Sequence, residues 1–358
     1  MSDSGLHLGE IADEADWRAL VERGLKGAPW SRLVGETADG IKLEPLYRES
    51  DIATADDVSG MPGAAPFIRG DAGWTIRQAF EHPDPAETNR EIFADLAGGV
   101  GGIELAIDPD GVRGVAIKDA RDLDIALADV ILEAAPVSLD AGEHGAWAAA
   151  LLRDKLKGVA AKGTNFGLDP VGATLRLGAV CKEEHEQALG FATDHHADFP
   201  AARFFRADAR TVHEAGGTEA QEIAAALSSG IHYLRALSEK GFNSDLAARV
   251  LSFAVSVGPD VLIETAKLRA LRLCWARVLE ASGAAPDARQ AHIHAFTSRR
   301  MMTRHDAQTN ILRVSTAAFA AAIGGANEIT TYAFTDALGL PTPFARRVAR
   351  NTQHVLLE

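Results

Sequence analysis

Apolar and polar positions alternate along most of the chain in a pattern that predicts strands and helices in turn. From about residue 74 onward, short apolar runs are separated by longer amphipathic stretches, with the period of a strand-helix unit. The apolar runs predict eight strands, at residues 74–78, 103–107, 136–140, 159–166, 203–208, 250–257, 292–298 and 328–333. The amphipathic stretches predict helices at residues 85–96, 120–133, 145–156, 183–195, 218–239, 259–281, 307–323 and 343–357.

Eight strands alternating with helices predict an α/β fold of the (β/α)8 TIM barrel type. Parallel strands need crossover helices, and closing the sheet removes both free edges. An open doubly wound sheet is the alternative. We assign residues 71–358 to the barrel and residues 1–70 to an N-terminal extension with a helix at 14–24. Such an extension has little core of its own, so we expect it to lie on the barrel or on another chain.

Composition narrows the choice of partner and location. The chain has 358 residues, is 47% hydrophobic and carries a formal net charge of -14. An acidic surface repels phosphate backbones, so no nucleic-acid partner is expected. No run approaches the roughly 18 apolar residues of a membrane span, and the first residues do not form a leader, so we expect no membrane contact and a cytoplasmic location. Cys181 and Cys274 do not have a metal-binding spacing.

Polar residues follow the predicted strands where a TIM barrel carries its chemistry, at the carboxyl ends. After the fifth strand these are Asp208, Arg210, Thr211, His213 and Glu214. A histidine, two carboxylates and an arginine could perform acid-base chemistry. They could equally act as helix caps and loop ties, and position alone leaves both interpretations open.

Two further groups of residues have candidate roles. His185, His195 and His196 could be metal ligands, but adjacent residues point to different helix faces, so we predict no metal site. Lys267 and Arg269 lie on the predicted helix at 259–281. They are either solvated-face residues or anchors for an anionic group.

Several sequence motifs carry a resemblance to a known family. They include WTIRQ at 74–78, EAG at 214–216, DALGLPT at 336–342 and ARNTQ at 349–353. In this order they resemble the barrel of the adenosylcobalamin-dependent methylmalonyl-CoA mutase family. The resemblance implies a TIM barrel that encloses a CoA thioester and a separate C-terminal domain that holds cobalamin. The implied reaction is the radical interconversion of succinyl-CoA and methylmalonyl-CoA, and some members are heterodimers of a catalytic large and a similar small subunit.

The sequence departs from the catalytic members of that family at the site itself. When the sequence is aligned on Glu214, Arg210 and Thr211 occupy the positions of the family's Tyr and His. An arginine and a threonine cannot replace both the tyrosine and the histidine. Phe296 stands where the family has a Gln two residues after the histidine that matches His294. The loop before Trp74 is shortened, as are the segments after Gly163-Thr164. The string at 194–199 lacks the Gly of the family's cobalt-ligating motif.

The resemblance therefore implies the small subunit of a heterodimeric mutase. We expect no catalytic residue in this chain, with Arg210, Thr211 and Phe296 as degenerate positions. Adenosylcobalamin would be bound by the catalytic large subunit, the expected partner, with no cobalamin-binding domain in this chain and no metal site. A residual CoA ester would contact Lys267, Arg269 and His294. The alternatives are an active barrel that works with a separate cobalamin-binding chain and a CoA-binding regulatory barrel, and it stays open whether the chain continues past Glu358.

Overall fold

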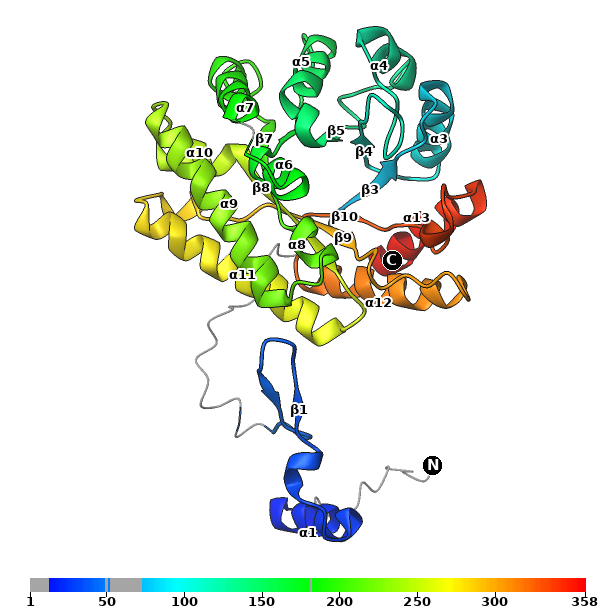
Figure 1. Cartoon of the computed structure of the whole chain (residues 1–358), viewed down its shortest axis with the longest axis vertical. Coiled ribbons are helices and arrows are strands. Elements are labelled where there is room, and N and C mark those ends of the chain that lie inside the picture. The colour runs from blue at the N-terminus through cyan, green and yellow to red at the C-terminus, as the bar shows by residue number, and fades with distance from the viewer. Residues whose placement is uncertain (1–12, 49–50, 52–72, 181) are drawn as a thin grey trace, which may run out of the picture. The chain divides into compact units, whose positions relative to one another are not determined.

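The computed structural model describes residues 13–48, 51, 73–180 and 182–358. The chain divides into two compact units, residues 1–57 and 58–358 (Figure 1). The boundary that we predicted near residue 70 falls among residues outside the described ranges. The assignment of 1–70 to an extension therefore stays a prediction.

The first unit contains one helix and a small hairpin. Its elements are α1 (Glu14–Leu25), the short 3-10 helix η1 (Trp30–Arg32), and the antiparallel strands β1 (Gly35–Glu36) and β2 (Lys42–Leu43). Trp17 and Trp30 meet edge to face, with ring centroids 5.5 Å apart. None of residues 13–48 is buried. This unit has no core within its described residues.

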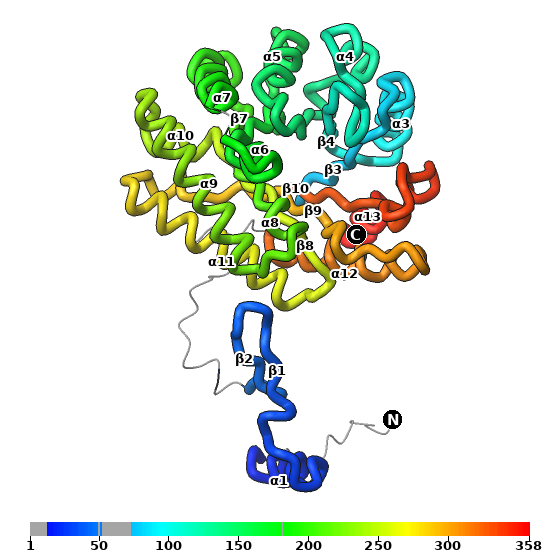
Figure 2. Tube along the Cα trace, in the orientation of Figure 1, coloured from blue at the N-terminus to red at the C-terminus, as the bar shows by residue number. Residues whose placement is uncertain are grey.

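The second unit is a closed barrel of eight parallel strands, which confirms the predicted (β/α)8 fold and excludes the open sheet. The strands are β3 (Thr75–Phe80), β4 (Gly102–Ala106), β5 (Val137–Asp140), β6 (Asn165–Leu168), β7 (Arg203–Asp208), β8 (Leu251–Val257), β9 (Ile293–Thr297) and β10 (Glu328–Thr330). They follow one another around the barrel in chain order, and β10 closes on β3. Figure 2 shows the trace running once around the ring from cyan to red.

Helices surround the strands on the outside of the barrel (Figure 1). They are α3 (Pro85–Ala97), α4 (Ala120–Ala126), α5 (Gly145–Lys155), α6 (Pro170–Leu177), α7 (Lys182–His195), α8 (Arg210–Glu214), α9 (Glu219–Glu239), α10 (Ser244–Val250), α11 (Val261–Ala281), α12 (Thr309–Ile323) and α13 (Pro343–Leu357), with 3-10 turns η2 (Gly142–His144), η3 (Pro286–Ala288) and η4 (Asp336–Leu338). Side-chain caps begin several of them, including Asp84 before Pro85 and a capping box at Thr218. Within the described ranges, no helix is long and apolar enough to cross a membrane.

Two predicted elements have different bounds in the structure. The strand expected at 159–166 begins only at Asn165, because Ala161 and Gly163 adopt positive φ values of 49° and 80° that end an extended run. The helix expected at 120–133 ends at Ala126, and Asp129 has φ 57°. The short helices α6, α8 and α10 were not predicted, since segments of five to eight residues give too few turns for a periodic signal.

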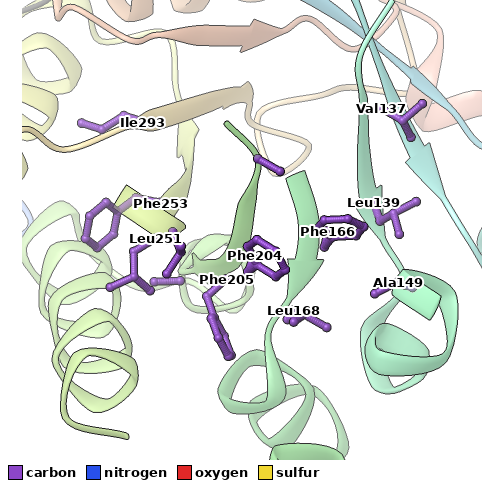
Figure 3. Close-up of a cluster of buried hydrophobic side chains, with 14 of the residues drawn as sticks. Val137, Leu139, Ala149, Phe166, Leu168, Phe204, Phe205, Leu251, Phe253 and Ile293 are labelled. Carbon is purple, nitrogen blue, oxygen red and sulfur yellow. The ribbon is translucent and has the colours of Figure 1, made fainter. Parts of the chain in front are cut away.

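The core lies between the sheet and its helices. Figure 3 shows part of it, where Phe166 and Phe204 of neighbouring strands lie together. Their ring centroids are 4.9 Å apart, and Phe191 of α7 lies 5.1 Å from Phe166. Aromatic contacts of this kind bury large areas and fix the position of a helix on a sheet. The outer layer is therefore an ordinary apolar core, and the unusual chemistry is inside the barrel.

Candidate functional site

The inside of the barrel holds a buried ion pair between its first and last strands. Arg77 on β3 donates to both carboxylate oxygens of Glu328 on β10, at 2.6 and 3.0 Å, and also to the backbone carbonyls of Ile103 and Pro136. Arg77 is fully buried and Glu328 nearly so. Burial alone would raise the pKa of Glu328, but Arg77 and His292 hold it well below its usual range. The pair therefore stays charged in the interior.

A second buried pair spans the barrel. Arg206 on β7 donates to Glu104 on β4 at 2.6 Å, and two strands separate β4 from β7 in the sheet. The pair must therefore cross the interior. Asp140 accepts a further contact from Arg206 at 3.2 Å. Bidentate or multiply paired arginines of this kind fill space and satisfy carboxylates that would be costly to bury alone.

The carboxyl ends of β5 and β7 are joined by Arg210, which begins α8. Its guanidinium donates to Asp208 from Nε at 2.9 Å and to Asp140 from Nη2 at 2.7 Å. Burial would lower the pKa of Arg210, but the two carboxylates raise it well above its ordinary value. Arg210 is therefore permanently charged, and its donors point at protein carboxylates.

Arg210 also covers an aromatic stack. Its guanidinium carbon lies 4.0 Å from the centroid of the Phe296 ring, and Phe296 lies 4.0 Å from the ring of His294 with the two planes 30° apart. Cation-π contact and stacking hold the three side chains together. Burial lowers the pKa of His294 well below its usual value, so its ring is neutral and hydrogen-bonds the Thr330 hydroxyl at 2.8 Å. The stack closes the base of the barrel mouth.

An open cavity of about 650 Å³ lies above this stack. Its lining includes Arg210 and Thr211, two of the three positions predicted as degenerate, together with Asp140 and Asp208. Arg113 and Arg176 also line it. The structure thus brings Arg210, Phe296 and His294 into one stack, although His294 is the second residue of β9 and does not lie at its carboxyl end.

Lys267 lies elsewhere, between α9, α11 and β8. Its ammonium is 2.8 Å from Glu222 and 2.5 Å from Glu264, and it donates to the carbonyl of Ser256 at 2.7 Å. Burial alone would lower the pKa of Lys267, but these two carboxylates raise it. Glu222 also lies 3.5 Å from His213, which hydrogen-bonds Ser298 at 2.7 Å. The ammonium of Lys267 thus has all three of these partners inside the protein.

The remaining predicted positions are separate from the mouth. Arg269 is half-buried on α11 and is not part of the lining of the mouth cavity. His195 contacts Arg153 and Asp198, whereas His196 stacks on Phe242. Neither of these histidines shares a partner with His185 in the described contacts. The contacts to a CoA ester predicted for Lys267, Arg269 and His294 stay a prediction.

Sequence reasoning missed the charged residues inside the barrel. Glu104 lies in the middle of β4 (GIELA), and Arg77 and Arg206 lie within β3 (TIRQAF) and β7 (RFFRAD). Glu328 begins β10 (EIT). A lone charge within an apolar strand is costly unless it is paired. Two acidic and two basic positions of this kind were the available signal, because they predict pairing inside the closed sheet.

Asp169, at the end of β6, is a buried carboxyl with a perturbed pKa. One oxygen accepts the Tyr233 hydroxyl at 2.6 Å and caps α6 through the Gly172 amide at 3.1 Å. Burial, with the nearby charge of Asp208, raises its pKa to about 6. An acid whose pKa is higher in the folded state destabilises that state once it ionises, so the free energy of unfolding should fall as pH rises from about 4 to about 6.

We expect Asp169→Asn to raise the free energy of unfolding at pH 8 and to change it little at pH 4. The shift of about two pKa units corresponds to roughly 3 kcal/mol at most, and the amide keeps the cap and tyrosine contacts. Urea denaturation at both pH values measures this. Asp119→Asn is the control. The exposed Asp119 caps α4, and its carboxylate accepts a hydrogen bond from the backbone of Arg121, which lowers its pKa. Loss of this charge should therefore destabilise the folded state at pH 8. Equal effects of Asp169→Asn at the two pH values would contradict the expectation.

Known proteins with similar sequences share one description. The family model described as methylmalonyl-CoA mutase matches residues 36–358. The chain is 38% identical to the methylmalonyl-CoA mutase small subunit of Streptomyces virginiae, with 100% of this chain and 60% of that protein covered. It is 38% identical to the methylmalonyl-CoA mutase small subunit of Propionibacterium freudenreichii subsp. shermanii, with 97% of this chain and 56% of that protein covered. It is 29% identical to the methylmalonyl-CoA mutase of Escherichia coli, with 97% of this chain and 53% of that protein covered. The chain thus spans 60% or less of the length of these relatives.

Proposed function

Because the chain belongs to the methylmalonyl-CoA mutase family, we propose that it is the barrel of a small subunit that stabilises a catalytic large subunit without performing chemistry itself. The reaction of the complex would be the adenosylcobalamin-dependent interconversion of succinyl-CoA and methylmalonyl-CoA, an isomerisation. The small-subunit names of the two relatives at 38% identity support this assignment. The cytoplasmic location stays a prediction.

The stack at the base of the mouth is the observation that carries the proposal. Catalytic members, by resemblance, have here a His that hydrogen-bonds the thioester carbonyl, a Tyr beside it, and a Gln. In this chain Arg210 is paired with Asp208 and Asp140, and Phe296 replaces the amide with a buried apolar ring. Below them, Arg206 and Glu104 cross the interior. A substrate that entered along the barrel axis would have to displace charged groups that are already satisfied.

The described residues do not fit cobalamin. A cobalt ligand needs an accessible imidazole nitrogen whose other nitrogen is oriented by a partner. The string at 194–199, nearest to the family's ligating motif, begins on the outer helix α7. There His195 is held between Arg153 and Asp198, away from the barrel mouth. We therefore assign the cofactor to the partner subunit and derive no step through it in this chain.

The N-terminal unit supports a role in assembly. None of residues 13–48 is buried, and several of their apolar side chains are exposed to solvent, including Leu20 at 65%, Ile41 at 61% and Tyr47 at 57%. A segment with this much exposed apolar surface and no core gains stability by packing on a second surface. We propose that this surface belongs to the large subunit.

Mixing the two subunits tests the proposal. This chain and the cognate large subunit would be purified separately, combined, and separated by size-exclusion chromatography. Mutase turnover with adenosylcobalamin and succinyl-CoA would then be assayed for each chain and for the mixture. We expect a stable complex and turnover that depends on the large subunit's own site. Turnover that survives loss of that site would mean that this barrel is catalytic.

Substitution at the degenerate positions sharpens the test. In the assembled complex, Arg210→Ala and Thr211→Ala should each leave turnover within about twofold, because neither side chain contacts the reacting atoms. The control substitutes the Tyr and His at the equivalent positions of the large subunit, which should abolish turnover. Chromatography of each variant shows whether the complex still forms. A loss of more than tenfold in the small-subunit variants, with the complex intact, would contradict a degenerate site.

The open mouth supports one second candidate, a regulatory site for a CoA ester. Its cavity of about 650 Å³ is large enough for part of such a ligand, and Arg113 and Arg176 on its lining could attract phosphate or carboxylate groups. Seven acidic side chains on the same lining oppose an anion: Glu81, Asp108, Asp110, Asp140, Glu143, Asp208 and Glu214. Calorimetric titration with CoA distinguishes this candidate from a purely structural barrel.

A further inference from the structure

Outside the barrel, two histidines from separate helices meet at the surface. The Nε2 atoms of His185 on α7 and His232 on α9 are 3.3 Å apart, with ring centroids 4.7 Å apart and planes at 57°. His185 is half-buried and His232 is exposed, so the pair is open to solvent on one side. They are 47 residues apart in the sequence, so only the packing of α7 beside α9 brings them together.

Although the sequence predicted no metal site, we propose that His185 and His232 bind a divalent transition-metal ion of the zinc class. In tetrahedral zinc sites the bonds to imidazole nitrogen are about 2.0–2.1 Å, so two such nitrogens lie roughly 3.3–3.4 Å apart. The observed 3.3 Å falls in this range. It is longer than the about 2.9–3.0 Å usual for a hydrogen bond from N–H. Imidazole is a ligand that suits zinc, copper and nickel alike.

The surroundings leave room for the rest of a coordination sphere. Both histidines line a cavity of about 370 Å³, whose apolar walls include Pro170, Val171 and Val180. Lys182 and Glu186 also line it, with opposite charges, so the cavity has no net charge that would repel a cation. In the described ranges no three metal-binding side chains cluster. The site therefore supplies two protein ligands and leaves the other positions to water or to a small exogenous ligand.

Both helices are anchored in the core close to their histidines. Tyr233, next to His232, is buried and donates its hydroxyl to Asp169 at 2.6 Å. On α7, Leu189 and Phe191 lie one to two turns beyond His185 and are buried in the core. Burial and the neighbouring His232 also lower the pKa of His185, which favours the neutral imidazole that metals bind. Two ligands fixed in this way lose little freedom when an ion binds.

Zinc titration tests the site. The chain of residues 1–358, stripped with a chelator, would be titrated with zinc chloride by calorimetry at pH 7.5. Cys181→Ser and Cys274→Ser would be present throughout, so that thiolates cannot contribute. We expect one zinc ion per chain, and at least tenfold weaker binding in His185→Gln and in His232→Gln. His195→Gln, on the same helix as His185, is the matched control and should bind as the parent chain does.

Thermal unfolding gives a second readout. An ion that bridges α7 and α9 binds only the folded chain, so zinc should raise the melting temperature of the parent and of His195→Gln but not of the two site variants. Melting without zinc shows that the variants are folded. The proposal is overturned if the parent binds no zinc, or if His185→Gln or His232→Gln binds it as tightly as the parent does.

Discussion

Arg77→Met is expected to destabilise the barrel by about 3–5 kcal/mol, measured by urea denaturation. The substitution leaves Glu328 buried and without its arginine, and breaking one partner of a buried pair has this cost because the remaining charge is uncompensated. The backbone carbonyls of Ile103 and Pro136 each lose one donor as well, although Pro136 still accepts from the Ile103 amide at 2.9 Å. The buried carboxylate of Glu328 is the group left poorly satisfied, whereas water would solvate it in the unfolded chain.

Two variants separate the loss of charge pairing from the loss of volume. Arg77→Met combined with Glu328→Met removes both charges, and we expect it to be more stable than Arg77→Met alone. If the single variant is insoluble, recovery of soluble protein in the double variant makes the same comparison. Arg90→Met is the surface control: its pair with Glu87 is 66% and 45% exposed, and its loss should change stability by less than about 0.5 kcal/mol. Equal effects of Arg77→Met and Arg90→Met would refute the role of the interior pair.

Substituting the exposed apolar residues of the N-terminal unit is expected to weaken the complex with the large subunit at least 100-fold. Leu20→Asp with Tyr47→Asp places two charges where apolar side chains are 65% and 57% exposed. Truncating a central anchor residue of an interface costs about 2 kcal/mol, and each 1.4 kcal/mol is a tenfold change in affinity. Binding of the purified chains by calorimetry or surface plasmon resonance gives the dissociation constant.

A barrel variant provides the control for that measurement. Leu312→Asp changes a leucine on α12 that is 72% exposed, so it adds one such charge at a similarly open position. We expect it to leave affinity close to that of the unmodified chain. If Leu20→Asp with Tyr47→Asp binds as tightly as Leu312→Asp does, the N-terminal unit does not contact the large subunit. In that case, deletion of residues 1–48 should not affect assembly of the complex.

Much of the fold was accessible to sequence reasoning because its signals are local. Seven of the eight strands begin within two residues of their predicted start, and all eight predicted helices exist. The fourth strand was misplaced because VAAK at 159–162 reads as an apolar run, whereas positive φ at Ala161 and Gly163 makes a turn. At Gly167 a side chain would lie 2.0 Å from the carbonyl of Leu139, so the strand that does form passes unusually close to its neighbour.

The candidate site could be predicted only in part from the sequence. Polar residues at strand ends pointed to Asp208, Arg210 and Thr211, and the structure places them on one cavity. The sequence left Lys267 either on a solvated face or as an anchor for an anionic group. The structure instead buries it against Glu222 and Glu264, so the solvated-face interpretation is wrong for this residue. A single sequence does not show which partners lie on other helices.

The sequence by itself determined the fold class and the family resemblance, since both follow from the order of short patterns along the chain. Only the tertiary structure decided which charges are paired. Arg77 and Glu328 are 251 residues apart, and Glu104 and Arg206 are 102 apart, yet each pair is joined at 2.6 Å once the sheet closes. The same holds for His185 and His232, which meet only because α7 packs beside α9. Closure of the barrel converts charges that would be unfavourable in isolated strands into satisfied pairs, because each then lies within hydrogen-bonding distance of the opposite sign.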